Sequence, residues 1–318
     1  MVRGISKTLV AGGAGFIGSH IVDFLLEADK EVTVLDNLYS GKRENVERYK
    51  ENENFRFVKG EVRNFELVKR LVSDVDAVFN LAAVVSVPRS VENPLLVNDV
   101  NVGGALNLLK ASCDSGVKRF VQSSSASVYG DAEVLPLHED SPTKPISPYA
   151  VAELAAENYA NAFCRVYGLE TVCLRYFNVF GPRQTYSAYS GVITIFVNQL
   201  LRNQSPTVLG DGEQTRDFVY VEDVVRANML ALTEKDAVGE VFNISSGRET
   251  SLNRLIQLLQ KIMGKTNLNP VFSEPRTGDI QHSCASIEKA ERMMGYEPKT
   301  SLEEGLTKLC EWASAKRI

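Results

Sequence analysis

The chain has 318 residues, of which 44% are hydrophobic, so it can bury a large core, and we expect one large or two closely associated lobes. Its net charge of -5 argues against a general nucleic-acid binder, which needs a positive surface, and its five cysteines and three histidines form no C-x-x-C pair or metal cluster. No run approaches the roughly 18 apolar residues of a membrane span and no apolar signal region opens the chain, so we expect a cytoplasmic protein that binds neither nucleic acid nor membrane.

Short β-branched runs alternate with amphipathic stretches through the first half of the chain. We expect strands at 8–10, 32–35, 55–58, 77–79 and 120–121, and helices at about 16–28, 64–73, 98–115 and 148–167. This alternation is typical of an α/β protein, and it predicts a doubly wound Rossmann fold with a parallel sheet.

The composition of the sequence changes at about residue 178, where longer expected loops rich in Gly, Pro, Tyr and Ser begin. We assign 1–177, together with a returning segment at 217–240, to the Rossmann domain. The remaining parts, 178–216 and 241–318, are expected to form a smaller C-terminal α/β lobe that binds the substrate.

Three glycines, Gly12, Gly15 and Gly18, lie between the first expected strand and the first expected helix. Without side chains they let the backbone turn tightly and approach a pyrophosphate at the helix N-terminus, although a purely structural turn needs glycine too. Asp36, at the end of the second strand, can accept hydrogen bonds from both hydroxyls of a ribose and would repel a 2′-phosphate. The sequence therefore predicts NAD as the cofactor in preference to NADP.

Further motifs are spread over essentially the whole chain. They are LAA at 81–83, NVGG at 101–104, SSSASVYG at 123–130, SPY at 147–149, RYFNVFGP at 175–182, RDFVYVEDV at 216–224 and RTGD at 276–279. Together they resemble the extended short-chain dehydrogenase/reductase family, specifically nucleotide-sugar 4-epimerases of the UDP-glucose and UDP-N-acetylglucosamine type.

The resemblance implies the roles of two catalytic residues. Tyr149 would be the base that removes the proton from the 4-hydroxyl of the sugar, and Ser125 would hydrogen-bond the same oxygen. Transient oxidation at carbon 4 with bound NAD, followed by return of the hydride to the other face, would invert this one centre. A free tyrosine titrates near pH ~10, so a base at neutral pH needs positive charge nearby, and the nicotinamide cation can supply part of it.

Glu153 departs from the family pattern, which has a lysine four residues after the tyrosine, one helical turn on. An ionised carboxylate cannot donate to the nicotinamide ribose and would raise the pKa of the phenol. Three interpretations stay open: a natural variant with a substitute cation, a substitution introduced to trap a complex, and a binding protein that has lost turnover. A protonated Glu153 that donates a hydrogen bond is a further hypothesis.

The resemblance also implies the remaining cofactor contacts. Glu61 stands where relatives usually carry an aspartate that contacts adenine, and its extra methylene should still let the carboxylate reach the adenine amino group. The expected NAD-binding residues beyond the glycines and Asp36 are Phe16, Ile17, Asn37, Ser40, Gly41, Glu61, Val62, Leu81, Ala82, Ala83, Asn101, Tyr149 and Phe177.

The substrate implied by the resemblance is a UDP-hexose or a UDP-N-acetylhexosamine. Arg216 and Arg276 would clamp the diphosphate, for which the guanidinium fork is suited, although a surface ion pair is the alternative for either one. Ser283 is a small residue at a position where a tyrosine would exclude an acetamido group. The expected substrate-binding residues are Ser86, Arg89, Ser125, Ser127, Asn178, Val192, Thr207, Val208, Leu209, Arg216, Arg276, Asp279 and Ser283.

Two alternatives concern the reaction and the assembly. Dehydratases of this kind carry an acid just before Val-Tyr-Gly, whereas this chain has Ala126 and Ser127, which favours epimerisation over elimination. An NAD-dependent oxidoreductase, which would transfer hydride to NAD without returning it to the sugar, is the alternative from another class of enzyme. The expected helices at 98–115 and 148–167 have apolar faces beyond what the sheet needs, which predicts a homodimer, or else a second buried face within one chain.

Overall fold

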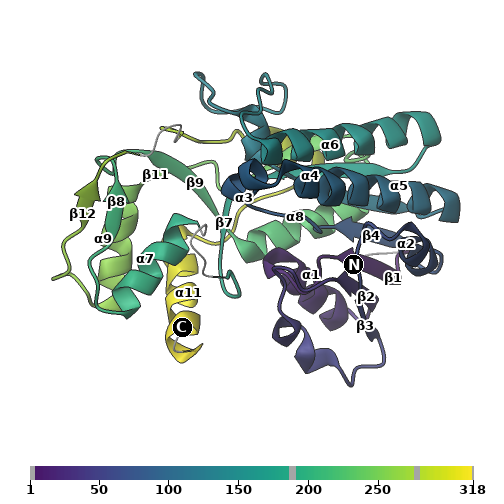
Figure 1. Ribbon diagram of the computed structural model, residues 1–318, viewed down its shortest axis with the longest axis horizontal. Coiled ribbons are helices and arrows are strands. Elements are labelled where there is room, and N and C mark those ends of the chain that lie inside the picture. The colour runs from purple at the N-terminus through teal and green to yellow at the C-terminus, as the bar shows by residue number, and fades with distance from the viewer. Residues whose placement is uncertain (1–3, 186–190, 276–279, 317–318) are drawn as a thin grey trace.

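A computed structural model describes residues 4–185, 191–275 and 280–316 (Figure 1). Seven strands form a parallel sheet in the order β10-β6-β5-β4-β1-β2-β3. The order reverses between β1 and β4, and such a switch point is where doubly wound folds bind ligands. The bounds are β1 (Lys7–Ala11), β2 (Glu31–Asp36), β3 (Phe55–Lys59), β4 (Ala77–Asn80), β5 (Arg119–Ser125), β6 (Thr171–Tyr176) and β10 (Val241–Ile244). The predicted Rossmann fold is confirmed.

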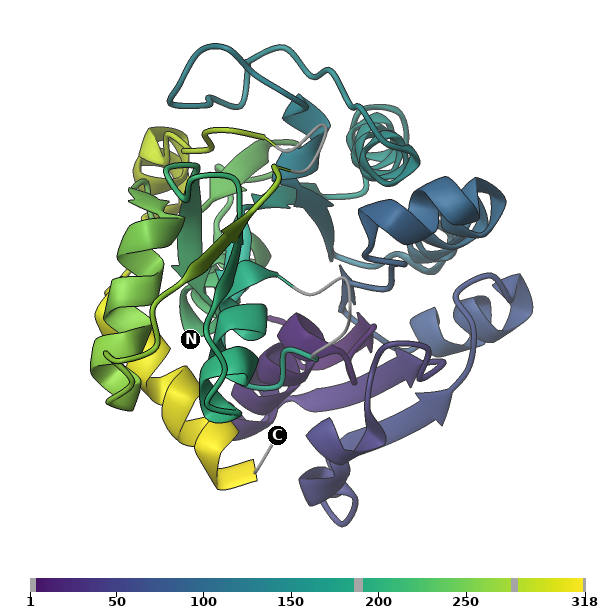
Figure 2. The ribbon, with the colours of Figure 1, turned by 60° about the vertical axis from the view of Figure 1, so that its left-hand side comes forward.

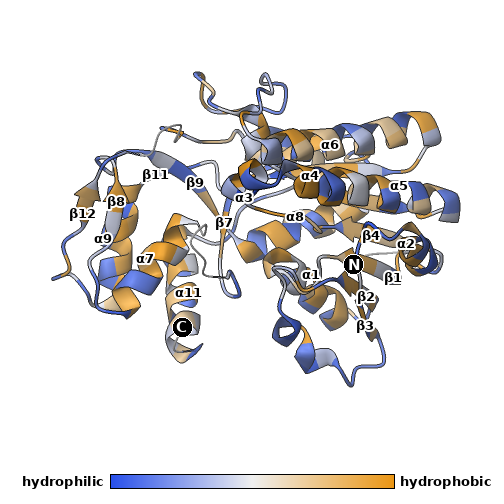
Figure 3. Cartoon of the chain, in the orientation of Figure 1, coloured by the Kyte–Doolittle hydropathy of each residue, from blue (hydrophilic) through white to orange (hydrophobic). Residues whose placement is uncertain are grey.

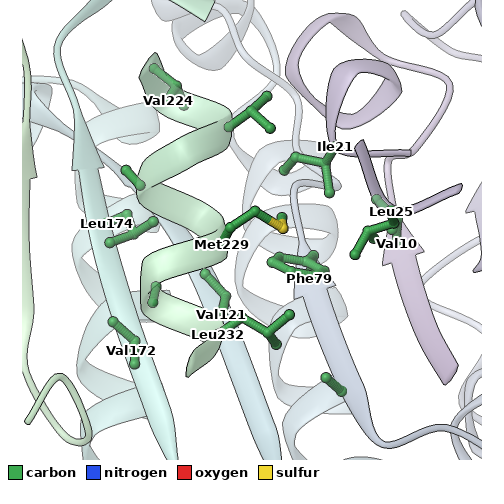
Figure 4. Packing of buried hydrophobic residues seen from close by; sticks show 14 of the residues in the cluster. Val10, Ile21, Leu25, Phe79, Val121, Val172, Leu174, Val224, Met229 and Leu232 are labelled. Carbon is green, nitrogen blue, oxygen red and sulfur yellow. The ribbon is translucent and has the colours of Figure 1, made fainter. Parts of the chain in front are cut away.

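Helices cover both faces of this sheet, as its nearly continuous apolar strands require. On β1, Leu9 packs into one buried cluster and Val10 into another, because successive side chains point to opposite faces. One face is covered by α2 (Phe65–Val72), α5 (Gly104–Ser115) and α6 (Pro148–Tyr167). The other is covered by α1 (Phe16–Glu27), α8 (Val221–Thr233) and α10 (Glu288–Met294). Figure 4 shows Met229 of α8 lying between strand residues and Ile21 of α1.

The expected helix at 98–115 is more complex in the structure. Two short helices, α3 (Val87–Glu92) and α4 (Pro94–Val97), come first, each with a proline in its first turn and a side-chain cap, Ser86 and Asn93 respectively. A π-helical turn, η3 (Asn98–Gly103), then joins α4 to α5. Apolar periodicity predicts a helix here but cannot reveal a turn with one extra residue, so this feature was missed.

A second lobe is built on its own core of buried apolar residues. Its helices are α7 (Val192–Leu201), α9 (Leu252–Met263) and α11 (Leu302–Lys316), and α9 and α11 lie side by side, as Figure 2 shows. Figure 3 shows that α7 is hydrophobic along most of its length. Two small sheets complete the lobe, β8 (Thr207–Leu209) with β12 (Val271–Ser273), and β11 (Glu249–Ser251) with β9 (Thr215–Tyr220) and β7 (Asn178–Phe180).

The chain passes between the lobes more often than the sequence analysis expected. Residues 241–244, assigned there to the C-terminal lobe, form β10 at the edge of the seven-stranded sheet. The division into two domains stays a prediction. In the described part of the chain, no helix has the length and apolar character needed to cross a membrane.

Candidate active site

The glycine loop lies between β1 and α1, at the switch point of the sheet. Gly12 has φ +80°, and a Cβ there would lie 2.7 Å from the carbonyl oxygen of Leu81. A Cβ on Gly18 would collide with the carbonyl oxygen of Gly12. Gly15 is the N-cap residue of α1. The loop therefore keeps bare backbone at a helix N-terminus, an arrangement that binds phosphate groups.

Asp36, the last residue of β2, connects this loop to the segment that follows β2. Its Oδ2 accepts from the backbone N–H of Ala14 at 3.0 Å and its Oδ1 from that of Leu38 at 2.8 Å. Burial raises the pKa of Asp36 against these two hydrogen bonds. A carboxylate has about four acceptor positions, so both oxygens can still accept from ribose hydroxyls. A Cβ on Gly41 would lie 2.9 Å from each of these oxygens, so a larger residue there would crowd them.

The other predicted cofactor residues lie in α1 or directly after strands of the large sheet, at the carboxyl ends of those strands. Glu61 accepts from Asn37 Nδ2 at 3.1 Å and also pairs with Arg63, so its carboxylate lies beside the segment after β2. Leu81 directly follows β4 and contacts the glycine loop through the close approach at Gly12. The remaining members of the set are Phe16 and Ile17 in α1, Ser40 after β2, Val62 after β3, Ala82 and Ala83 after β4, and Phe177 after β6.

Ser125 and Tyr149 meet at the end of β5. Tyr149 is the second residue of α6, whose first turn is fixed by Pro148 and by the Ser147 Oγ, which accepts from the backbone N–H of Ala150 at 3.2 Å. Burial and then the Glu153 carboxyl raise the pKa of Tyr149, and its hydrogen bond with the Ser125 side chain opposes them. The phenol is therefore firmly protonated in the protein alone.

Glu153 lies one helical turn after Tyr149 and is only 6% exposed. Asn101 of η3 donates from Nδ2 to Glu153 Oε1 at 2.8 Å. Burial, together with the charge of Glu157, raises the pKa of Glu153 to about 7 against that hydrogen bond. Among residues 4–185, 191–275 and 280–316, no lysine or arginine forms a salt bridge with Glu153 or Tyr149, so the described residues supply no substitute cation by direct pairing.

Glu157, one further turn along α6, holds the nearby arginine. Arg175 of β6 donates from Nε and Nη2 to the two oxygens of Glu157, at 2.9 and 2.6 Å, and Ser124 Oγ adds a third bond at 2.8 Å. Arg175 Nη1 also donates to the hydroxyl of Tyr129 at 2.7 Å. The sequence analysis missed this buried pair; the available signals were an acid at every fourth position after Tyr149 and an arginine inside an apolar strand.

The predicted substrate residues are distributed over the second lobe, the end of β5 with η4 (Ala126–Tyr129), and α3. Ser127 Oγ is buried without a hydrogen-bond partner among the described residues. Asn178 Nδ2 donates to the carbonyl oxygen of Asp217 at 3.3 Å. Arg216 Nη1 donates to the carbonyl oxygen of Thr215 at 2.8 Å. Ser283 is buried.

A cleft of about 830 Å³ opens beside β8 and β12. Leu209 lines it, together with Phe272 of β12 and Gln281, while Thr207 and Val208 precede Leu209 in β8. Val192 begins α7. Arg276 and Asp279 lie outside the described residues.

Arg89 has a partner that the sequence analysis did not predict. Its Nη1 donates to the hydroxyl of Tyr39 at 2.8 Å, and its guanidinium lies 5.3 Å from the centre of the Tyr39 ring. Ser86 caps the same short helix by accepting from the Arg89 backbone N–H at 3.3 Å. Arg89 thereby joins α3 to the segment after β2, on the cofactor side of the switch point.

Comparison with known proteins gives a consistent result. Residues 8–245 match the NAD dependent epimerase/dehydratase family. A putative UDP-glucose 4-epimerase of Methanocaldococcus jannaschii is 40% identical over 306 residues, which cover 96% of this chain and 97% of the relative.

Two solved structures extend the comparison. The UDP-glucose 4-epimerase of Thermotoga maritima, solved with UDP-glucose, has a TM-score of 0.92 and 43% identity, covering 98% of this chain and all (100%) of that one. The UDP-N-acetylglucosamine 4-epimerase of Methanobrevibacter ruminantium, in complex with UDP-N-acetylmuramic acid, has a TM-score of 0.94 and 38% identity, covering 98% of this chain and 99% of that one.

Proposed function

Because the chain belongs to the NAD-dependent epimerase/dehydratase family and uses NAD, we propose that it is a UDP-sugar 4-epimerase. Its preferred reaction is the interconversion of UDP-N-acetylglucosamine and UDP-N-acetylgalactosamine, with activity on UDP-glucose and UDP-galactose as well. The observation that carries the proposal is the meeting of Ser125, at the end of β5, with Tyr149, at the start of α6, on the same carboxyl edge of the parallel sheet as the glycine loop. This pair can hold and move the proton of one sugar hydroxyl.

The residues around the switch point fit NAD. Side chains at Gly12 and Gly18 would fill the space where backbone must meet a pyrophosphate, and Asp36 keeps free acceptor positions for two ribose hydroxyls. The same carboxylate would repel the 2′-phosphate of NADP. When bound, NAD supplies the acceptor and donor of the hydride at carbon 4.

Tyr149 accepts the proton of the sugar 4-hydroxyl when the hydride leaves and returns it when the hydride comes back. Its raised pKa means that the phenol becomes a base only when positive charge is brought close to it. Ser125 orients the same sugar oxygen, and Ser127 Oγ, buried without a hydrogen-bond partner among the described residues, has an unused hydrogen-bonding capacity beside it. The turn η4 offers no carboxyl group, so a hydroxyl leaving from carbon 6 would lack a proton donor there, which favours epimerisation over dehydration.

The choice of sugar rests on Ser283. Its side chain is small and buried, and a large side chain at this position would compete with an acetamido group for the same space. We expect Ser283→Tyr to lower kcat/KM for UDP-N-acetylglucosamine by about 10- to 100-fold, because filling a pocket costs roughly 1–3 kcal/mol, with a smaller effect on UDP-glucose. Ser283→Ala is the matched control and should keep both activities. Equal loss on both sugars in the tyrosine variant would contradict this assignment.

The alternative is a catalytically impaired variant or a sugar-nucleotide-binding homologue. The presence of Glu153, with no cation paired to it within the described part of the chain, favours this alternative. Product analysis after incubation with each UDP-sugar separates the two, and accumulation of NADH would instead indicate net oxidation. The Glu153→Lys variant tests the position itself. Unchanged turnover in that variant would mean that residue 153 does not limit the reaction.

We also propose that the chain acts as a homodimer in the cytoplasm. Apolar side chains on α6 and α4 are exposed, among them Val151, Val166, Tyr167 and Leu95. A hollow of about 530 Å³ beside α4 and the start of α6 is lined by Leu95, Ile146 and Val151. Light scattering after gel filtration tests the assembly, and a monomer at micromolar concentration would exclude it.

A further inference from the structure

The two oxygens of Glu153 are not equivalent. The backbone N–H of Val84 donates to Asn101 Oδ1 at 2.8 Å, and this bond fixes the orientation of the Asn101 amide. Its Nδ2, which can only donate, therefore points at Glu153 Oε1, 2.8 Å away. Oε1 accepts this bond, and the carbonyl oxygen of a carboxylic acid is its better acceptor, so a proton on this carboxyl group is favoured on Oε2.

Oε2 remains available for another partner. No described residue hydrogen-bonds it, and it is not among the buried side-chain atoms sealed off without a partner. Val84, which anchors Asn101, directly follows the segment of Leu81, Ala82 and Ala83 on the cofactor side of the sheet. The π-helical turn η3 carries Asn101 to this position between α4 and α5.

We propose that Glu153 binds NAD as a neutral carboxylic acid, donating a hydrogen bond from Oε2 to a hydroxyl of the nicotinamide ribose, and that ionisation of Glu153 weakens cofactor binding. This rests on the use of NAD by the family and on the proposed epimerase site around Tyr149. It deepens the proposed function by assigning a positioning residue where relatives place a lysine. Asn101 is the second positioning residue, because it decides which oxygen carries the proton.

The surroundings of Glu153 favour the neutral form. The charged and titratable groups around this part of α6 include Tyr149 and Glu157 on α6, Arg175, Cys173 and Tyr176 on β6, Tyr129 on η4, Asp99 on η3, and Arg89 and Glu92 on α3. Arg175 is committed to Glu157, and Asp99 is exposed. Lys110 and Asp114 of α5 pair with each other, and Arg119 begins β5 and pairs with Glu170. Burial and the charge of Glu157 hold the pKa of Glu153 at about 7.

Ionisation of Glu153 should act on binding and on chemistry together. The carboxylate loses the donor that the ribose hydroxyl needs, and its charge raises the pKa of Tyr149 further. The neutral acid does neither. A site with a carboxyl group in place of a lysine can therefore work at the acidic side of neutrality, where Glu153 is protonated.

The test is the dissociation constant of NAD, measured by calorimetry on the cofactor-free full chain between about pH 6 and about pH 9. If only the protonated form binds well, Kd for the unaltered protein should rise by about tenfold for each pH unit above the midpoint. Glu153→Gln keeps an acceptor for Asn101 and a donor for the ribose, so its Kd should match the low-pH value and stay flat. Asp99→Asn, an exposed carboxyl on η3, should follow the unaltered protein.

A second measurement needs no variant. Calorimetry in two buffers of different ionisation enthalpy gives the number of protons taken up with NAD, which should approach about one at pH ~8 and fall toward zero at pH ~5. Flat binding in the unaltered protein, an equal slope in Glu153→Gln, or no proton uptake would overturn the proposal. Product analysis with UDP-sugars is a separate readout, so a failed substrate assignment leaves the pH dependence of NAD binding intact, and the reverse also holds.

Discussion

Glu153→Gln should remove a pH-dependent penalty on folding. An unfolded glutamate titrates near 4.5, whereas in the folded protein burial raises the pKa of Glu153 to about 7. Between these values the folded state binds more protons than the unfolded state, so stability should rise as pH falls from about 7 toward 4.5. Above pH ~7 both states are ionised and the full penalty is present. Each unit of pKa corresponds to about 1.4 kcal/mol, so the penalty is ~3 kcal/mol.

Urea unfolding of the cofactor-free protein, followed by far-UV circular dichroism, measures this effect. At pH ~8 the Gln variant should be more stable than the unaltered protein by up to ~3 kcal/mol, and at pH ~5 the two should be similar. Asp99→Asn, an exposed carboxyl on η3, is the control and should change little. The reasoning is refuted if the two stability curves run parallel from about pH 5 to about pH 8.

Two further changes probe other parts of the site. Arg175→Met should destabilise the protein by about 3–5 kcal/mol in denaturant unfolding, because it leaves the Glu157 carboxylate buried without its cation. The double variant that also carries Glu157→Gln should recover part of this stability. Equal stability of the single and double variants would contradict the pairing argument. Gly18→Ala should weaken NAD binding by about tenfold or more, because its Cβ collides with the Gly12 carbonyl, whereas Gly103→Ala, whose Cβ would meet nothing nearer than 4.0 Å, should keep most of the affinity in calorimetry.

Local sequence was sufficient to predict the cofactor loop, whereas the resemblance to the epimerase family singled out Tyr149. Gly18 is needed by a backbone contact within a single strand–turn–helix unit, and Gly12 by the close approach of Leu81 at the end of the neighbouring strand β4, so the spacing of the glycines together with Asp36 indicated the turn. Asp36 is the last residue of the next strand. Tyr149 follows Pro148 at the start of a helix that is rich in strong helix-forming residues. In each case, the determining contacts lie within a few residues or between adjacent elements.

The partners of Glu153 could not be predicted in the same way. Asn101 reaches Glu153 because of a π-helical turn, which leaves no periodicity signal, and Glu157 is satisfied by an arginine on a strand that pairs with β5. Arg89 contacts Tyr39 across fifty positions of sequence. Such contacts depend on how helices and strands far apart in the sequence pack against one another, and a short stretch of a single sequence does not reveal this packing.

The position of β10 has a consequence for how the protein folds. The segment 1–177 contains six of the seven strands of the large sheet but lacks β10, and it also lacks α8, whose Val224 and Met229 cover one face of β5 and β6 (Figure 4). An isolated fragment of these residues would expose that face to water. The nucleotide-binding half therefore cannot fold completely during synthesis until residues beyond 240 have been made. Because the two halves share this sheet, we expect them to unfold together in one cooperative transition.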